Sequence, residues 1–303
     1  KEIVNKIFYS TVVHRSIISL EGDDKINFLQ SIVTNDIKKA KNQYAVWAAL
    51  LSPQGKFLHD FFIFLFKDKL LLTCEKERED DLLLRLEKLK LRAKVTLKKE
   101  NTLKLFVLWN PNIPSEEQEK IVIENIKNHT NLIFFPDPRL KNSGMFIISE
   151  PNSFKTSFDN NIITSKSYLD YDEFRIKLGI PDGSKDMPVE KSYILENGFK
   201  ELNGIDFNKG CYIGQEVTAR MHYRGLIKKR LVPTYINGSP PPAGSLLTIN
   251  DKKIGVMMSS VEKNGLALVN LQEWSKLEYL DLKFEKTGIK PLIQEWINKE
   301  KIS

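Results

Sequence analysis

The sequence predicts an α+β protein that ends in a small antiparallel β-barrel. Over the first two thirds of the 303 residues, apolar runs with strand character alternate with segments whose apolar residues have helical spacing. In the last quarter only short apolar runs remain, and turn residues separate them. A chain of this length can bury a sizeable core and form two or three domains.

Strands and helices alternate in the first hundred residues. The apolar residues Ile26, Leu29 and Ile32 lie at helical spacing after a Gly-Asp-Asp turn and predict a helix. A turn over 52–56 separates two apolar runs. We predict strands at 16–20, 44–51, 57–66 and 70–74, and helices at 25–33 and 77–89.

The middle third repeats this pattern. Glu116 and Glu117 follow Pro114 in the first turn of a predicted helix, where the helix dipole favours acidic side chains. A second helix ends near Gly179. We predict strands at 103–109, 132–135 and 145–148, a helix from Pro114, a helix at 168–178 and a loop at 183–188.

The composition changes after about residue 230. A glycine- and proline-rich run at 238–244 breaks any regular element, and the turn pairs at 250–251 and 264–265 separate short strands. Short strands at this spacing predict a small antiparallel barrel. We predict strands at 246–249, 254–259 and 266–271. We predict an N-terminal α+β subdomain at 1–100, a second α+β subdomain at 101–228 and the barrel at 229–303.

The composition also limits the class of protein. Hydrophobic residues at 41% and charged residues at 28% are typical of a soluble globular protein. The net charge of +7 is spread over many lysines, so we do not expect a nucleic-acid partner. The longest apolar run, 61–66, is too short for a membrane span, and we expect no secretory signal at the start. The first residue is not a methionine, which is compatible with a start inside a longer gene product.

The most informative segment is 209–216, Lys-Gly-Cys-Tyr-Ile-Gly-Gln-Glu, which places Cys211 between two glycines ahead of a predicted helix at 215–222. The positive end of that helix, together with Lys209 and Arg220, would lower the thiol pKa and favour the nucleophilic, metal-binding thiolate. The alternative is that Cys211 is a small buried apolar residue, as lone cysteines often are.

The count of ligands limits what this thiol can do. The chain has two cysteines, which indicates a reducing compartment, and Cys74 at the end of an apolar strand is expected to be structural. An iron–sulfur cluster normally has about four protein ligands, mostly thiolates. Cys211 could therefore only share a cluster, with the remaining ligands coming from a partner protein or a small thiol. His222 is a second candidate ligand, although a surface or capping role is more common.

The segment 209–216 resembles the cysteine motif of the YgfZ family, relatives of the glycine-cleavage T protein, which is an aminomethyltransferase. The resemblance covers most of the chain, and it also includes 20–23, 28–30, 34–37, 52–60 and 175–181. Four further segments are most similar to the Iba-type branch of mitochondria and alphaproteobacteria: 183–188, 195–197, 212–220 and 225–231.

The resemblance implies a folate-binding-type region of two α+β subdomains followed by a C-terminal β-barrel. It implies a factor that matures iron–sulfur proteins, particularly those with four-iron clusters, with Cys211 as the functional thiol that ligates a transient, shared cluster. The implied partners are an A-type iron–sulfur carrier and iron–sulfur client enzymes. The implied compartment is the cytoplasm of a bacterium or the mitochondrial matrix of a eukaryote. The residues expected to support the thiol are Lys209, Gly210, Tyr212, Gly214, Gln215, Glu216 and Arg220.

A folate-type pocket is the competing expectation, with tetrahydrofolate as its cofactor and Asn35, Asp60 and Arg175 as its residues. The aminomethyltransferases have acidic residues at the positions of His59 and Asp60, and only Asp60 is acidic here. They have a pterin-binding glutamate at the position of Lys177, and a lysine has no acceptor for the pterin N–H groups. They also lack the cysteine motif.

We therefore expect an assembly factor rather than a turnover enzyme. The alternative is a tetrahydrofolate-dependent aminomethyl or one-carbon transferase in which Asp60 holds the reacting nitrogen. A third interpretation, an RNA-modification accessory protein, rests only on the basic balance of the chain.

Overall fold

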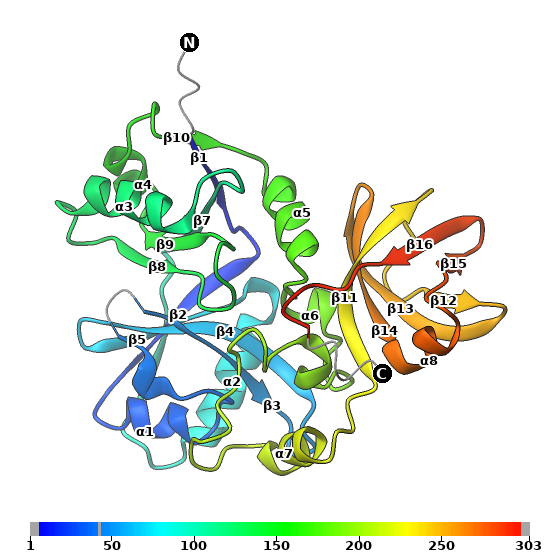
Figure 1. The fold of residues 1–303 in the computed structure, drawn as a ribbon. Coiled ribbons are helices and arrows are strands. Elements are labelled where there is room, and N and C mark those ends of the chain that lie inside the picture. The colour runs from blue at the N-terminus through cyan, green and yellow to red at the C-terminus, as the bar shows by residue number, and fades with distance from the viewer. Residues whose placement is uncertain (1–5, 42–43, 298–303) are drawn as a thin grey trace. The chain divides into compact units, whose positions relative to one another are not determined.

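The computed structural model describes residues 6–41 and 44–297, and its strands form two five-stranded sheets and one closed barrel (Figure 1). The chain divides into two compact units. The sheet unit comprises the described residues up to Leu50, His59–Tyr171 and Asn203–Ile213. The barrel unit comprises Leu51–Leu58, Asp172–Leu202 and the described residues from Gly214 onward. In the part of the chain that the structure describes, no helix is long and apolar enough to cross a membrane.

The first sheet has the strand order β3-β4-β5-β2-β6. Strands β4 and β5 form the predicted hairpin, with Lys67 in its turn at a positive φ of 53°. Most of β4 is buried, which explains why its sequence is a nearly unbroken apolar run rather than an alternating one. The elements of this part are β2 (Arg15–Glu21), α1 (Lys25–Gln30), η1 (Ile37–Lys39), β3 (Val46–Leu51), β4 (Phe57–Phe66), β5 (Lys69–Glu75), η2 (Lys76–Arg78), α2 (Glu79–Lys90) and β6 (Thr96–Lys99).

Helix α1 ends at Gln30, earlier than the predicted end at 33. Val33 instead pairs with Leu50 in an isolated antiparallel bridge, and the amide of Thr34 donates to the carbonyl of Ala49. The chain leaves the helix because it forms these contacts with β3. Apolar spacing alone continues through this point and cannot show where the helix stops.

The second sheet has the strand order β10-β1-β7-β9-β8, and β1 pairs parallel with β10 and antiparallel with β7. The ring of Phe106 on β7 stacks on that of Phe154 on α4, with their centroids 3.9 Å apart, inside the core of this part. The sequence did not predict β1, β10 or α4. The elements are β1 (Ile7–Thr11), β7 (Lys104–Trp109), α3 (Ser115–Ile126), β8 (Ile133–Pro136), β9 (Met145–Ser149), α4 (Pro151–Ser157) and β10 (Ile163–Ser165).

The predicted C-terminal barrel is present and closes in the order β11-β14-β13-β12-β15-β16. Closure leaves no unpaired sheet edge. Gly265 lies in its interior, where a Cβ atom would lie 2.2 Å from Cε of Met257, so a larger residue would require that flexible side chain to move. The elements are β11 (Lys229–Asn237), β12 (Leu246–Ile249), β13 (Lys252–Val261), β14 (Asn264–Asn270), α8 (Leu271–Lys276), β15 (Leu282–Phe284) and β16 (Thr287–Pro291).

The loop predicted at 183–188 was wrong in part, because 183–186 form one helical turn. The buried carboxylate of Asp186 accepts hydrogen bonds from Arg175 (2.7 Å) and from the backbone amide of Ser259 (3.1 Å). These hydrogen bonds to residues outside the helical turn hold it in place. The remaining elements are α5 (Tyr168–Leu178), α6 (Gly183–Asp186), η3 (Ile194–Asn197) and α7 (Gln215–Tyr223).

Candidate functional site

The two cysteines lie in opposite environments. Cys211 is exposed, so it is not the small buried residue that a lone cysteine often is. Cys74 is buried on β5, where its sulfur lies 3.4 Å from the hydroxyl of Ser16. Burial raises the pKa of the Cys74 thiol to about 11. Reactive or metal-binding thiol chemistry is therefore available at Cys211 and suppressed at Cys74.

Lys209 anchors the segment that carries Cys211. Its ammonium donates to three backbone carbonyl oxygens, those of Gln30 (2.7 Å), Val33 (2.6 Å) and Asn35 (3.0 Å). Burial lowers the pKa of Lys209 to about 8, which still leaves it charged at neutral pH. We expected Lys209 to act on the thiol through its charge. The structure gives it a second role, which is to fasten the thiol segment to the end of α1 and to the chain that follows it.

Tyr212, on the other side of the cysteine, is a buried residue of the same segment. The Lys209 ammonium lies 5.2 Å from the centroid of its ring, within the range of a cation–π contact. Burial raises the pKa of the Tyr212 hydroxyl well above its usual value. Cys211 is thus exposed between two side chains that point into the protein. Nothing lies within 4 Å of the Cβ position of Gly210, so the backbone beside the thiol is also open.

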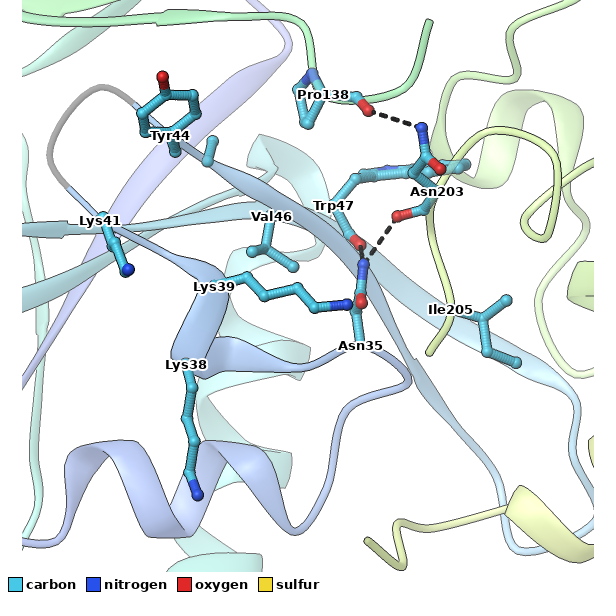
Figure 2. Close-up of a pocket in the computed structure, with 11 residues that line it drawn as sticks. Asn35, Lys38, Lys39, Lys41, Tyr44, Val46, Trp47, Pro138, Asn203 and Ile205 are labelled. Atoms are coloured by element: carbon cyan, nitrogen blue, oxygen red, sulfur yellow. Dashed lines mark hydrogen bonds between the residues drawn. The ribbon is translucent and has the colours of Figure 1, made fainter. Parts of the chain in front are cut away.

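A second set of contacts holds residues 203–206, which lead into the segment that carries Cys211. The Asn35 amide donates to the carbonyls of Asn203 (2.7 Å) and Trp47 (2.8 Å), as Figure 2 shows. The hydroxyl of Thr34 donates to the carbonyl of Gly204 (2.8 Å), and the carbonyl of Thr34 accepts from the amide of Asp206 (3.0 Å). The chain on the N-terminal side of Cys211 is therefore held by hydrogen bonds at two places, at residues 203–206 and at Lys209.

Gly214 lies within the motif, immediately before helix α7. It caps this helix at a φ of +81°, and a Cβ atom there would lie 2.6 Å from the carbonyl oxygen of Ser52. Gly55, at a φ of +75°, approaches Val217 of α7 in the same way. The turn predicted at 52–56 thus packs against the start of the helix predicted after Cys211, and glycine is required on both sides of that contact.

The remaining motif residues lie on α7. Arg220 forms an ion pair of 3.5 Å with Glu216, and both side chains are exposed, so the pair adds little stability. Gln215 is the first residue of the helix. The ring of His222 lies against that of Tyr223, with centroids 4.8 Å apart. Among the described residues, no group of three or more His, Cys, Asp or Glu side chains is placed to hold a metal ion.

The folate-type residues fall into two places. Asp60 is buried, and its carboxylate accepts hydrogen bonds from Arg15 (3.0 Å) and from Nε1 of Trp47 (3.1 Å). The side-chain amide of Asn35 donates to the backbone carbonyl of the same tryptophan. Arg175 belongs to the barrel unit, where Asp172 and Asp186 hold it at 2.7 Å each.

The two residues that depart from the aminomethyltransferases have ordinary structural partners. His59 is buried, and Nε2 lies 2.8 Å from the carboxylate of Asp81. Burial, with the nearby positive charge of Arg78, lowers the pKa of His59 to about 4, so the ring is neutral at pH 7. Lys177 is partly exposed and forms an ion pair of 2.7 Å with Glu173.

The sequence did not predict a lysine-lined pocket in this part of the molecule. A pocket of about 580 Å³ lies beside the Asn35 contacts (Figure 2). Its composition, with several lysines, was read from the sequence only as part of a dispersed basic balance. Its lining residues are Asn35, Lys38, Lys39, Lys41, Tyr44, Ala45, Val46, Trp47, Pro138, Asn203 and Ile205.

Three similar proteins found by comparison share one name. Residues 228–299 match the family model described as the CAF17 C-terminal beta-barrel domain. The mitochondrial iron–sulfur cluster assembly factor IBA57 homolog of Mycosarcoma maydis is 32% identical over 251 residues, which cover 77% of this chain and 58% of the relative. The homolog of Neurospora crassa is 31% identical over 238 residues, covering 75% and 54%. Mouse IBA57 is 29% identical over 248 residues, covering 76% and 66%.

The homologues of this chain are IBA57 iron–sulfur cluster assembly factors. The resemblance to the Iba-type branch is thereby confirmed. The chain spans little more than half the length of the two fungal IBA57 relatives.

The fold has a second, more distant likeness. The glycine cleavage system aminomethyltransferase T of Bartonella henselae superposes with a TM-score of 0.74 over 97% of this chain and 87% of that chain, at 14% identity. This confirms the aminomethyltransferase-like α+β fold. This chain therefore combines such a fold with a C-terminal barrel that matches the CAF17 family model.

Proposed function

We propose that this protein is an iron–sulfur cluster assembly factor in which the Cys211 thiolate ligates a cluster shared with a carrier protein. The observation that carries the proposal is the exposure of Cys211 on a segment that Lys209 and Asn35 fasten to the protein. The assembly-factor names of the curated relatives support the same function.

A lone thiolate suits cluster transfer better than cluster storage. The thiol releases its proton when it binds iron, and the thiolate is a soft ligand that suits iron–sulfur clusters. The described residues offer no cluster of further ligands around it. The other ligands therefore come from the carrier or from a small thiol, and the cluster is cargo that passes through the complex. A cluster held by one thiolate on this side can be released to a client without breaking several protein bonds.

Anchoring of the segment reduces the entropy lost on docking. A thiol on a free loop would have to be ordered when the carrier binds, whereas the contacts of Lys209 and Asn35 order it beforehand. Lys209 and Tyr212 are positioning residues in this proposal. Arg220 and Glu216, which are exposed on α7, are available to contact the carrier.

The partner and compartment follow from the same proposal. The carrier is of the A-type, and the clients are enzymes with four-iron clusters. The compartment is the mitochondrial matrix for a eukaryotic source and the cytoplasm for a bacterial one; the word mitochondrial in the names of the curated relatives supports the first of these.

The test is a cluster-transfer experiment with two cysteine variants. The apo protein is mixed anaerobically with a cluster-loaded A-type carrier, and the visible absorption spectrum and complex formation are recorded. The wild type should change the spectrum and form a complex, and Cys211→Ser should do neither. Cys74→Ser is the matched control, since it changes the buried cysteine and should behave as the wild type does. Identical spectra and complexes for Cys211→Ser and wild type would remove the proposal.

Folate-dependent transfer is the alternative, and the contacts of Asp60 bear on it. Its carboxylate already accepts hydrogen bonds from Arg15 and Trp47, so the nitrogen of tetrahydrofolate would have to compete with both. Calorimetric titration with tetrahydrofolate decides the matter. Binding that Asp60→Asn abolishes, together with turnover of an aminomethyl donor, would favour the transferase. An absence of heat at millimolar ligand would remove it.

A further inference from the structure

The lysine-lined pocket of Figure 2 is formed entirely by residues of the sheet unit. Lys38 and Lys39 belong to the short helix η1, and Lys41 follows it. In Figure 2, Lys39 extends across the pocket toward Asn35, while Lys41 stands on the side of Tyr44. Its volume of about 580 Å³ is in the range of small-molecule sites and exceeds what a single water or ion needs.

The pocket has an excess of positive charge. None of the described residues that line it is acidic. Lys39 forms an ion pair of 2.6 Å with Asp206, but the ammonium groups of Lys38 and Lys41 have no acidic partner in the ranges 6–41 and 44–297. A concave wall with one sign of charge concentrates the electrostatic potential and attracts a ligand of the opposite sign. A small anion is therefore the ligand that this charge favours.

The rest of the lining is suited to the body of such a ligand. Val46, Pro138 and Ile205 supply apolar surface, and the ring of Tyr44 is 66% exposed at the edge. Asn203 is held by its hydrogen bonds to the carbonyl of Pro138 (3.3 Å) and from the amide of Asn35 (2.7 Å). The wall opposite the lysines is therefore already formed before any ligand enters. Of the three folate-type residues, Asn35 lines the pocket, whereas Asp60 and Arg175 do not.

We propose that this pocket binds a small polyanion, with Lys38, Lys39 and Lys41 contacting carboxylate or phosphate groups and the apolar wall contacting the remainder. A bound anion would compete with Asp206 for the ammonium of Lys39, since Asp206 forms an ion pair with that ammonium in the structure. Asp206 and Asn203 both belong to the segment Asn203–Ile213 that carries Cys211. The site is thus built into the support of the thiol, but it does not depend on the proposed role of that thiol.

Isothermal titration calorimetry of the full chain in metal-free buffer tests the proposal, with citrate as the carboxylate probe and pyrophosphate as the phosphate probe. We expect saturable binding of at least one probe, weakened by salt because exposed charges are screened. Tighter binding of citrate assigns a carboxylate ligand, and tighter binding of pyrophosphate assigns a phosphate ligand.

Charge-removing variants locate the binding. Lys38→Ala and Lys41→Ala should each weaken it about fivefold, the effect of losing one exposed charge contact. Lys263→Ala removes an equivalent exposed charge from the barrel unit and should leave the affinity unchanged. Thermal unfolding of each variant checks that the fold is intact. The proposal is overturned if neither probe binds at millimolar concentration, or if Lys263→Ala weakens binding as much as the pocket variants do.

Discussion

Three glycines in the sequence around Cys211 differ in what an added methyl group would meet. Gly214 has a φ of +81° and a Cβ position 2.6 Å from the carbonyl oxygen of Ser52. Gly225 has a φ of +62° with nothing within 4 Å of that position. Gly210 has equally open space and is not among the residues at positive φ. The three positions therefore separate backbone strain from steric overlap.

The expected losses of stability follow from these two contributions. A non-glycine residue in the left-handed region costs about 1 kcal/mol, so Gly225→Ala should lose about that much. Gly214→Ala adds overlap with backbone atoms, which a flexible side chain cannot relieve, for a total of about 3 kcal/mol. Gly210→Ala meets neither penalty and should stay within about 0.5 kcal/mol of the wild type.

Urea unfolding followed by far-ultraviolet circular dichroism measures all three variants. The unfolding free energies are compared at an unchanged dependence on denaturant. The order of destabilisation should be Gly214→Ala, then Gly225→Ala, then Gly210→Ala. If Gly214→Ala costs no more than Gly225→Ala, the packing of the 52–56 turn against α7 does not constrain this glycine, and the reasoning fails.

Three further outcomes can be measured with similar means. The pKa of His59 is lowered to about 4 from about 6.5 in the unfolded chain, so the unfolded chain binds more protons between these values. This pKa difference contributes about 3 kcal/mol to the free energy of unfolding, which is fully present above pH 6.5 and is lost as the pH falls toward 4. His59→Gln should lack this part of the pH dependence in urea unfolding. A pH profile identical to that of the wild type would contradict the lowered pKa of His59. Asp186→Ala leaves the buried Arg175 with one of its two carboxylate partners and should cost about 3 kcal/mol, whereas a loss below about 1 kcal/mol would show that the buried ion pair is replaceable. Iodoacetamide should label Cys211 in the native protein and Cys74 only after unfolding, as peptide mass spectrometry can check; equal native labelling would contradict the burial of Cys74.

Local sequence patterns were sufficient where an element is specified by its own residues. The β4–β5 hairpin, helix α5 and the strands β12 to β14 follow from apolar runs between turn residues. Strands β1, β6 and β10 could not be found in this way. Short strands such as β10 exist because of their partners, and β1 pairs with residues 95 to 156 positions away. Nothing in the residues of β1 specifies that pairing.

The candidate site divides along the same line. Cys211 was found because a single thiol between glycines is informative by itself. The anchoring of Lys209 could not be predicted, since its acceptors are carbonyls of Gln30, Val33 and Asn35, and every residue has a carbonyl. The partners of Asp60 were also hidden, because Arg15 is 45 positions away and is not distinguished from other arginines in the sequence.

The anchoring of Lys209 also has a consequence for the order of folding. Its acceptor Gln30 is the last residue of α1, so a cation 179 positions later in the chain meets the carbonyl end of that helix. A helix of six residues has little stability alone and gains from positive charge at this end. During synthesis, the start of the chain must wait for about 180 further residues before this contact can form. The contact between the thiol segment and the first helix therefore forms late, and a chain that stops short of residue 209 leaves the carbonyl end of α1 without this cation.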